Sequence, residues 1–206
     1  VEPRPAYVQR IAEALVEAMA SVSPVIEEAE PGIVFADLRG TERLIPRLGD
    51  LERIAFASTP RGLQPRLGVA DHRFTARMAA LRARPREALA VHASDAAEFL
   101  APEHVSHLPL EDEAIERLLL LGIESCGHLA RLPRHAVEAQ FGPAGGLAWL
   151  AASGEDPTPL TPRPWERERV IEQVQAEPPL VSKEAVTLAL EQLLGRALRH
   201  PRVRNR

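Results

Sequence analysis

The sequence of 206 residues has 45% hydrophobic and 26% charged side chains, a formal net charge of −4 and a single cysteine. This composition is typical of a globular protein with a hydrophobic core and excludes a disordered chain. No apolar run approaches the roughly 18 residues of a membrane span, and the N-terminal segment lacks the apolar stretch of a signal peptide. We therefore expect neither membrane association nor a signal peptide. The lone Cys126 excludes an internal disulfide and favours the reducing cytoplasm.

Charge is distributed unevenly along the chain. Residues 39–92 hold eleven arginines and five acidic residues, a net charge of +6, whereas residues 93–128 hold one arginine and eight acidic residues, a net charge of −7. A basic block inside an acidic chain is typical of a surface that binds phosphate. Solvated arginines on exposed helix faces would produce the same pattern, so charge alone leaves both readings open.

The first hundred residues predict a layer of helices and strands. Strands are predicted at 33–38, 66–70 and 89–92, and helices at 6–22, at 51–57, from residue 74 and up to residue 100. Asp50, Asp71 and Ser94 precede three of these helices and are suited to cap them.

After residue 109 the pattern changes to short helices separated by glycine and proline. They are predicted at 111–121, 125–131, 134–141 and 143–152. The segment GEDPTPLTPRP, residues 154–164, holds four prolines and predicts a linker. Beyond it we expect a strand at 169–176 and a long amphipathic helix that begins near Ser182.

The known short motifs for phosphate loops, serine nucleophiles and zinc proteases are absent from the sequence. Cys126 has the context of a small buried thiol, and we expect no cofactor and no metal-binding residues. Two features favour phosphate binding. Short helices that begin near Gly122 and Gly127 can present backbone N–H groups, and arginines cluster around the strand and helix at 66–82.

Three stretches resemble Y-family (translesion) DNA polymerases. VIEEAEPGIVFADLRGTE at 25–42 is similar to the strand pair of the family's palm, RLGVADHRFTARMAA at 66–80 to a palm strand with its following helix, and LLLLGIESCGHLARLP at 118–133 to the thumb. The resemblance implies an α+β multi-domain fold. Its parts would be an α/β palm layer at 1–92, a small all-helical thumb at 93–153, a Pro-rich linker at 154–165 and the start of an α/β little finger at 166–206. The family's first Asp motif and its fingers would lie upstream of Val1.

The sequence also departs from this family. Active members carry an adjacent Asp-Glu pair in the first stretch, and it falls here on Gly32 and Ile33, which cannot ligate Mg²⁺. Arg73 stands where the family has a lysine that contacts the nucleotide, and Leu110-Glu111-Asp112-Glu113 replaces the first hairpin of the thumb. These departures resemble the ImuB group of catalytically inactive, polymerase-like bacterial proteins and favour a protein that is not an enzyme.

The resemblance therefore predicts a non-catalytic adaptor in DNA repair and SOS mutagenesis that binds the DNA backbone without sequence preference. The predicted DNA-binding residues are Arg66, Arg73, Arg77, Gly122, Ser125, Gly127, Arg131 and Arg134. The resemblance implies as partners an error-prone replicative-type polymerase subunit, the sliding clamp and a recombinase-like accessory protein, in the bacterial cytoplasm at the nucleoid. Two alternatives stay open: an active error-prone translesion DNA polymerase, and a protein-interaction module without DNA contact.

Overall fold

The computed structural model describes residues 5–57, 59, 62–162, 173 and 181–199. The chain divides into two compact units, Val1–Arg163 and Pro164–Arg206. Helices and small sheets are mixed in the first unit, which confirms the predicted α+β class. None of the helices in the described ranges combines the length and the apolar character that a membrane crossing needs.

The first unit begins with a helix and an antiparallel hairpin. Helix α1 (Pro5–Ala20) is followed by strands β1 (Ile26–Glu30) and β2 (Ile33–Ala36), and Glu27 pairs with Phe35 in the register between them. Gly32 has a φ of +89° in the tight turn between the strands, a backbone conformation that glycine adopts without strain. The resemblance predicted this strand pair, and the apolar run at 33–38 forms its second strand.

A strand–helix–strand unit follows the hairpin. After α2 (Leu48–Ala57), strand β3 (Leu67–Val69) runs parallel to β4 (Ala88–Ala90), and α3 (Arg73–Arg82) connects them. Helix α3 packs very closely on β3, because a Cβ on Gly68 would lie only 1.9 Å from the carbonyl oxygen of Ala76. Only glycine at position 68 allows this approach of helix and strand.

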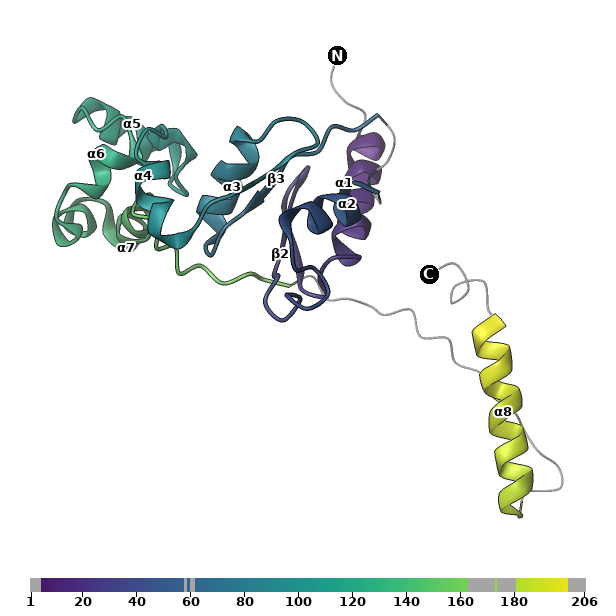
Figure 1. Ribbon diagram of the computed structural model, residues 1–206. Coiled ribbons are helices and arrows are strands. Elements are labelled where there is room, and N and C mark those ends of the chain that lie inside the picture. Colours follow the sequence, from purple (N-terminus) through teal and green to yellow (C-terminus); the bar gives the residue numbers. More distant parts are fainter. Residues whose placement is uncertain (1–4, 58, 60–61, 163–172, 174–180, 200–206) are drawn as a thin grey trace. The chain divides into compact units, whose positions relative to one another are not determined.

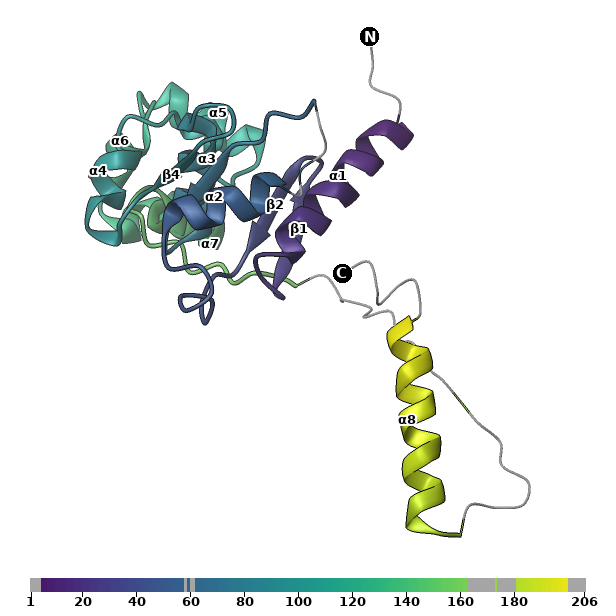
Figure 2. The ribbon, with the colours of Figure 1, turned by 45° about the vertical axis from the view of Figure 1, so that its right-hand side comes forward.

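Short helices form the other end of the first unit, as Figures 1 and 2 show. They are the 3₁₀ turns η1 (Ala93–Asp95) and η2 (Val105–His107) and the helices α4 (Ala96–Leu100), α5 (Asp112–Leu120), α6 (Cys126–Ala130) and α7 (Arg134–Ala152). Gly142, with a φ of +68°, interrupts the helical backbone of α7 immediately before Pro143. The predicted boundary between helices at 141 and 143 is confirmed, because Gly142 separates two helical stretches that share the label α7.

The main hydrophobic core joins these helices to α3. Its largest buried side chains include Met78 of α3, Leu100 of α4, Leu118 of α5 and Leu129 of α6. A smaller core lies at the other end, where Leu51 and Ala55 of α2 pack with Val22. The helical end and the α/β layer are thus held together by side chains of α3.

The second unit contributes one described helix, α8 (Lys183–Arg199). The hydroxyl of Ser182 accepts a hydrogen bond from the amide of Ala185 at 3.1 Å, as expected for the start of this helix. The strand predicted at 169–176 lies outside the described residues, apart from Gln173.

The predicted helix caps were wrong at three positions. Asp50 lies inside the first turn of α2, the residue before α3 is His72 and not Asp71, and Ser94 lies within η1, where its hydroxyl donates to Asp95. At α3 the reason is tertiary, since the carboxylate of Asp156, far along the chain, accepts the hydrogen bond from the amide of Phe74.

Candidate nucleic-acid interface

The first candidate side chain, Arg73 at the start of α3, is already paired inside the protein. Its guanidinium donates to the carboxylate of Glu27 on β1, with the closest N–O distance 2.8 Å. The same guanidinium lies 4.7 Å from the ring centre of Phe35, which faces Glu27 across the hairpin. The side chains of Arg73 and Glu27 are 21% and 12% exposed, so this ion pair is largely shielded from water.

Arg77 makes a similar but more exposed pair one turn later on α3. Its guanidinium donates to the carboxylate of Glu30 at 2.9 Å, and the side chains are 33% and 52% exposed. Arg66, which precedes β3, is exposed and donates to the carbonyl of Leu81 at 3.1 Å. Of the three arginines predicted on this side, two therefore share their charge with a carboxylate of β1, and Arg66 has only a carbonyl partner.

The segment that leaves α7 is held on α3 by Asp156, which is 7% exposed. One carboxylate oxygen accepts from the amide of Phe74 at 3.3 Å and the other from the amide of Thr158 at 2.9 Å. The backbone oxygen of Asp156 lies 2.7 Å from Nδ1 of His72. Glu27 adds a further link, because its carboxylate accepts from the amide of Thr161 at 2.6 Å. Sequence reasoning missed Asp156, and its place in a proline-rich segment gives no local signal of this role.

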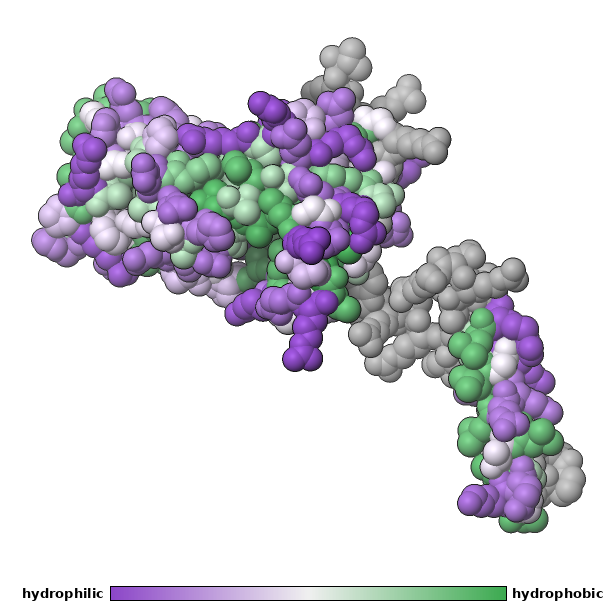
Figure 3. Space-filling model, in the orientation of Figure 1, coloured by the Kyte–Doolittle hydropathy of each residue, from purple (hydrophilic) through white to green (hydrophobic). Residues whose placement is uncertain are grey.

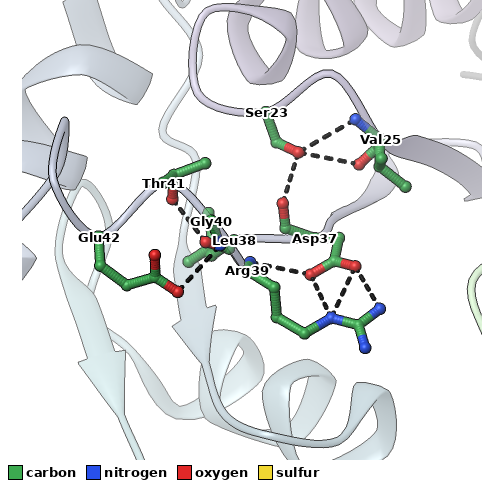
Figure 4. A network of polar contacts seen from close by, with 8 residues as sticks. All are labelled: Ser23, Val25, Asp37, Leu38, Arg39, Gly40, Thr41 and Glu42. Carbon is green, nitrogen blue, oxygen red and sulfur yellow. Dashed lines mark hydrogen bonds and ion pairs between the residues drawn. The ribbon is translucent and has the colours of Figure 1, made fainter.

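The turn after β2 has its own polar network, shown in Figure 4. Asp37 accepts hydrogen bonds from the guanidinium of Arg39 and, with a smaller effect, from its amide, and these bonds hold the pKa of the Asp37 carboxyl below its ordinary value. The amide of Gly40 donates to Glu42 at 2.9 Å and lowers the pKa of that carboxyl as well. Asp37 therefore fixes the turn that follows the strand.

On the helical side, the start of α6 is fully engaged within the fold. The amide of Cys126 donates to the carbonyl of Glu103, that of Gly127 to Ala101 and that of His128 to the hydroxyl of Ser125. A Cβ on Gly127 would lie 2.9 Å from the carbonyl oxygen of Ala101, so this glycine permits close packing against α4. Gly122, with a φ of +75°, makes the turn between α5 and α6. The N–H groups expected to face phosphate thus satisfy carbonyl and hydroxyl oxygens of the protein.

Two exposed arginines lie on the helices that follow this turn. Arg131 directly follows α6 and Arg134 begins α7, and both have exposed side chains. A hydrogen bond from α7 holds the segment between them, because Nε1 of Trp149 donates to the carbonyl of Leu132 at 2.9 Å. Trp149 packs against the main core. The charged groups that this surface offers to a ligand are therefore the side chains of Arg131 and Arg134.

The described residues do not fit the pair of metal ions that polymerase chemistry uses. Gly32 lies in the β1–β2 turn and Ile33 begins β2, and neither carries an oxygen donor in its side chain. The hairpin carboxylates Glu27 and Glu30 are paired with arginines. In the part of the chain that the structure describes, no group of three or more His, Cys, Asp or Glu side chains could hold a metal ion.

Comparisons with known proteins agree with the resemblance, although no protein-family model matches the chain. The chain is 30% identical over 168 residues to a protein named DNA polymerase IV 2 of Mesorhizobium japonicum, a match that covers 76% of this chain and 39% of that protein. It is 26% identical over 165 residues to DNA polymerase IV of Desulfatibacillum aliphaticivorans, and this match covers 77% of this chain and 41% of that protein. The chain thus spans about two fifths of the length of these curated relatives.

Solved structures of similar fold are also polymerases. A DinB-family error-prone DNA polymerase from Sulfolobus solfataricus superposes with a TM-score of 0.60 and 17% identity, over 78% of this chain and 50% of that one. A ternary complex of the polymerase Dbh superposes with a TM-score of 0.59 and 17% identity, over 78% of this chain and 49% of the Dbh chain. At this identity the likeness establishes the fold.

The relatives correct the expectation that the protein is not an enzyme. That expectation rested on Gly32 and Ile33, whereas relatives that share sequence with this chain bear the name of an enzyme, DNA polymerase IV. The inference was wrong because two positions of one hairpin do not decide the activity of a protein, when this chain spans only part of the length of its relatives. The chain is thus similar in sequence to proteins named DNA polymerase IV, and it shares a partial polymerase fold with solved Y-family DNA polymerases.

Proposed function

We propose that the first unit binds primer–template DNA through the phosphate backbone, as part of a protein that acts in translesion synthesis and DNA repair. The observation that carries the proposal is the shared fold, which covers more than three quarters of the chain and includes a polymerase ternary complex among the similar structures. The palm corresponds to the α/β layer and the thumb to helices α4–α7 in this proposal. Sequence-independent contacts agree with the absence of a groove-reading motif from the sequence.

The arginines divide into two groups in this proposal. Arg66, Arg131 and Arg134 are exposed, and no carboxylate among the described residues forms an ion pair with them, so they contact phosphate directly. Arg73 and Arg77 contribute only when phosphate replaces Glu27 and Glu30 as their partner. Ser125, Gly122 and Gly127 shape the turn and the helix start that place Arg131 and Arg134.

Fluorescence anisotropy with a labelled primer–template duplex tests the proposal at several salt concentrations. Each phosphate contact adds about 0.9 to the slope of log K against log salt, so the triple variant R66A/R131A/R134A should lower that slope by about 2 to 3. The triple variant R10A/R53A/R196A removes the same charge from exposed positions elsewhere and serves as the control. A binding constant that does not respond to salt, or an equal loss in both variants, contradicts the proposal and favours a protein-interaction module.

The partners implied by the resemblance belong to the same proposal. They are an error-prone replicative-type polymerase subunit, the sliding clamp and a recombinase-like accessory protein. Purified clamp and polymerase subunit, added to the 206-residue protein in analytical size exclusion, should co-elute with it if these partners bind this part of the chain. If the clamp and the polymerase subunit each elute separately from the 206-residue protein, the proposed partners are contradicted. The proposal of DNA binding does not depend on this result.

A further inference from the structure

Helix α5 exposes leucines that have no place in the core. Residues 118–121 are four consecutive leucines, and only the first is buried. Leu119, Leu120 and Leu121 are 38%, 86% and 61% exposed. Isolated exposed leucines are common in proteins, but three in sequence place apolar side chains around the last turn of α5 and its C-terminal end.

Exposed acidic side chains lie along α5 before these leucines and in the turn after them. Glu111, Asp112, Glu113, Glu116 and Glu124 are all exposed. Because helical neighbours are three or four residues apart, Glu116 and Leu120 share one face of α5, with Glu113 one turn before Glu116. Figure 3 shows hydrophobic and hydrophilic surface next to each other at the end of the first unit that carries α5.

The single basic residue among 111–124 does not neutralise this face. The guanidinium of Arg117 lies 5.9 Å from the ring centre of Phe141 on α7, and its Nε donates to the carbonyl of Glu113 at 3.4 Å. The surface that remains combines apolar side chains with a local excess of negative charge, which repels the phosphates of DNA.

We propose that Glu113, Glu116, Leu119 and Leu120, called here the acidic leucine face, bind a basic amphipathic helix of another protein. The leucines match the apolar stripe of such a helix, and the carboxylates match lysines and arginines along the borders of that stripe. Charge complementarity selects a basic helix over an acidic one and over DNA. This proposal does not rest on DNA binding by the arginines of α3, α6 and α7.

A designed peptide of about 18 residues, with leucines at helical spacing and lysines at the other positions, is a direct probe. Its labelled form is titrated with the 206-residue protein by fluorescence anisotropy at low and high salt. We expect saturable binding that weakens as salt is raised, because the carboxylates are exposed. The matching peptide with glutamates in place of the lysines should not bind.

Three variants locate the binding on α5. L119S/L120S should weaken binding of the basic peptide at least about tenfold, because apolar anchors dominate small interfaces. E113Q/E116Q should weaken it several-fold and reduce its salt dependence. L44S is the matched control, since Leu44 is 80% exposed in the turn between β2 and α2, and it should leave the affinity unchanged.

Four outcomes overturn the proposal. The first two are equal affinity of the wild type and L119S/L120S for the basic peptide, and equal binding of the basic and acidic peptides. The third is that the wild-type protein sediments as a dimer and L119S/L120S as a monomer, which would show that a second copy of this chain occupies the face. The fourth is loss of duplex DNA binding in L119S/L120S with the peptide affinity unchanged, which makes the face a nucleic-acid site. Duplex binding is measured separately, so failure here is distinguishable from failure of the proposed function.

Discussion

The carboxylate of Glu27 lies 2.8 Å from the guanidinium of Arg73, and it also accepts the amide of Thr161 at 2.6 Å. One side chain of the β1–β2 hairpin thereby connects the start of α3 with the segment that follows α7. An anion that binds Arg73 must compete with this carboxylate, so the hairpin controls the availability of the arginine.

Glutamine in place of Glu27 is expected to raise the affinity for duplex DNA. The neutral amide no longer competes with phosphate for Arg73, and one additional phosphate contact increases the salt slope of the binding constant by about 0.9. Anisotropy titrations at several salt concentrations measure both quantities. The control Glu98→Gln removes the same charge from an exposed position of α4. An equal rise in DNA affinity in this control would show that the gain comes from the lost charge and not from freeing Arg73 of its ion pair with Glu27.

Alanine in place of Asp156 should lower the free energy of unfolding by about 1–3 kcal/mol. The amides of Phe74 and Thr158 lose their acceptor, and the site is buried. Urea denaturation followed by circular dichroism gives the value. The neighbouring Glu155 is exposed, so Glu155→Ala should change stability by less than about 0.5 kcal/mol. Similar losses in both variants would contradict the assigned role of Asp156.

Two threonine substitutions should act in opposite directions. The Thr75 hydroxyl is buried and has no hydrogen-bond partner among the described residues, so Thr75→Val should stabilise the fold by about 1 kcal/mol. The Thr41 hydroxyl donates to the carbonyl of Leu38 at 2.6 Å, so Thr41→Val should destabilise it by about 1 kcal/mol. Chemical denaturation checks both, and a loss of stability in Thr75→Val would reveal a partner for that hydroxyl.

Cys126 should make stability fall at high pH. Burial, with a smaller contribution from the charge of Glu103, raises the pKa of this thiol to about 12 from its ordinary value of 9.0. Above pH 9 the unfolded chain loses a proton that the folded chain keeps, so the free energy of unfolding declines by up to about 1.4 kcal/mol per pH unit. The difference between wild type and Cys126→Ala, measured from pH 8 to pH 11, isolates this contribution. A parallel pH dependence of the two proteins would contradict it.

The local elements followed from local patterns. Apolar periodicity predicted α1, α5 and α8, because one face of a helix must meet a core wherever that core lies. Ser125 was expected to begin a helix and does, since its hydroxyl needs only the amide of His128 three residues later. The two strand segments that surround α3 were found from short apolar runs between turn residues.

By itself the sequence predicted most of the helices and three strands, since these depend on residue types at short spacing. Its resemblance to Y-family polymerases implied the strand pair of the hairpin and the α+β class. Only the tertiary structure decided the partners of the charged side chains. Arg73 meets Glu27 from 46 residues away, and Phe74 meets Asp156 from 82 residues away. Local spacing carries no signal of such contacts, because packing of the whole chain brings these groups together and burial makes their pairing necessary.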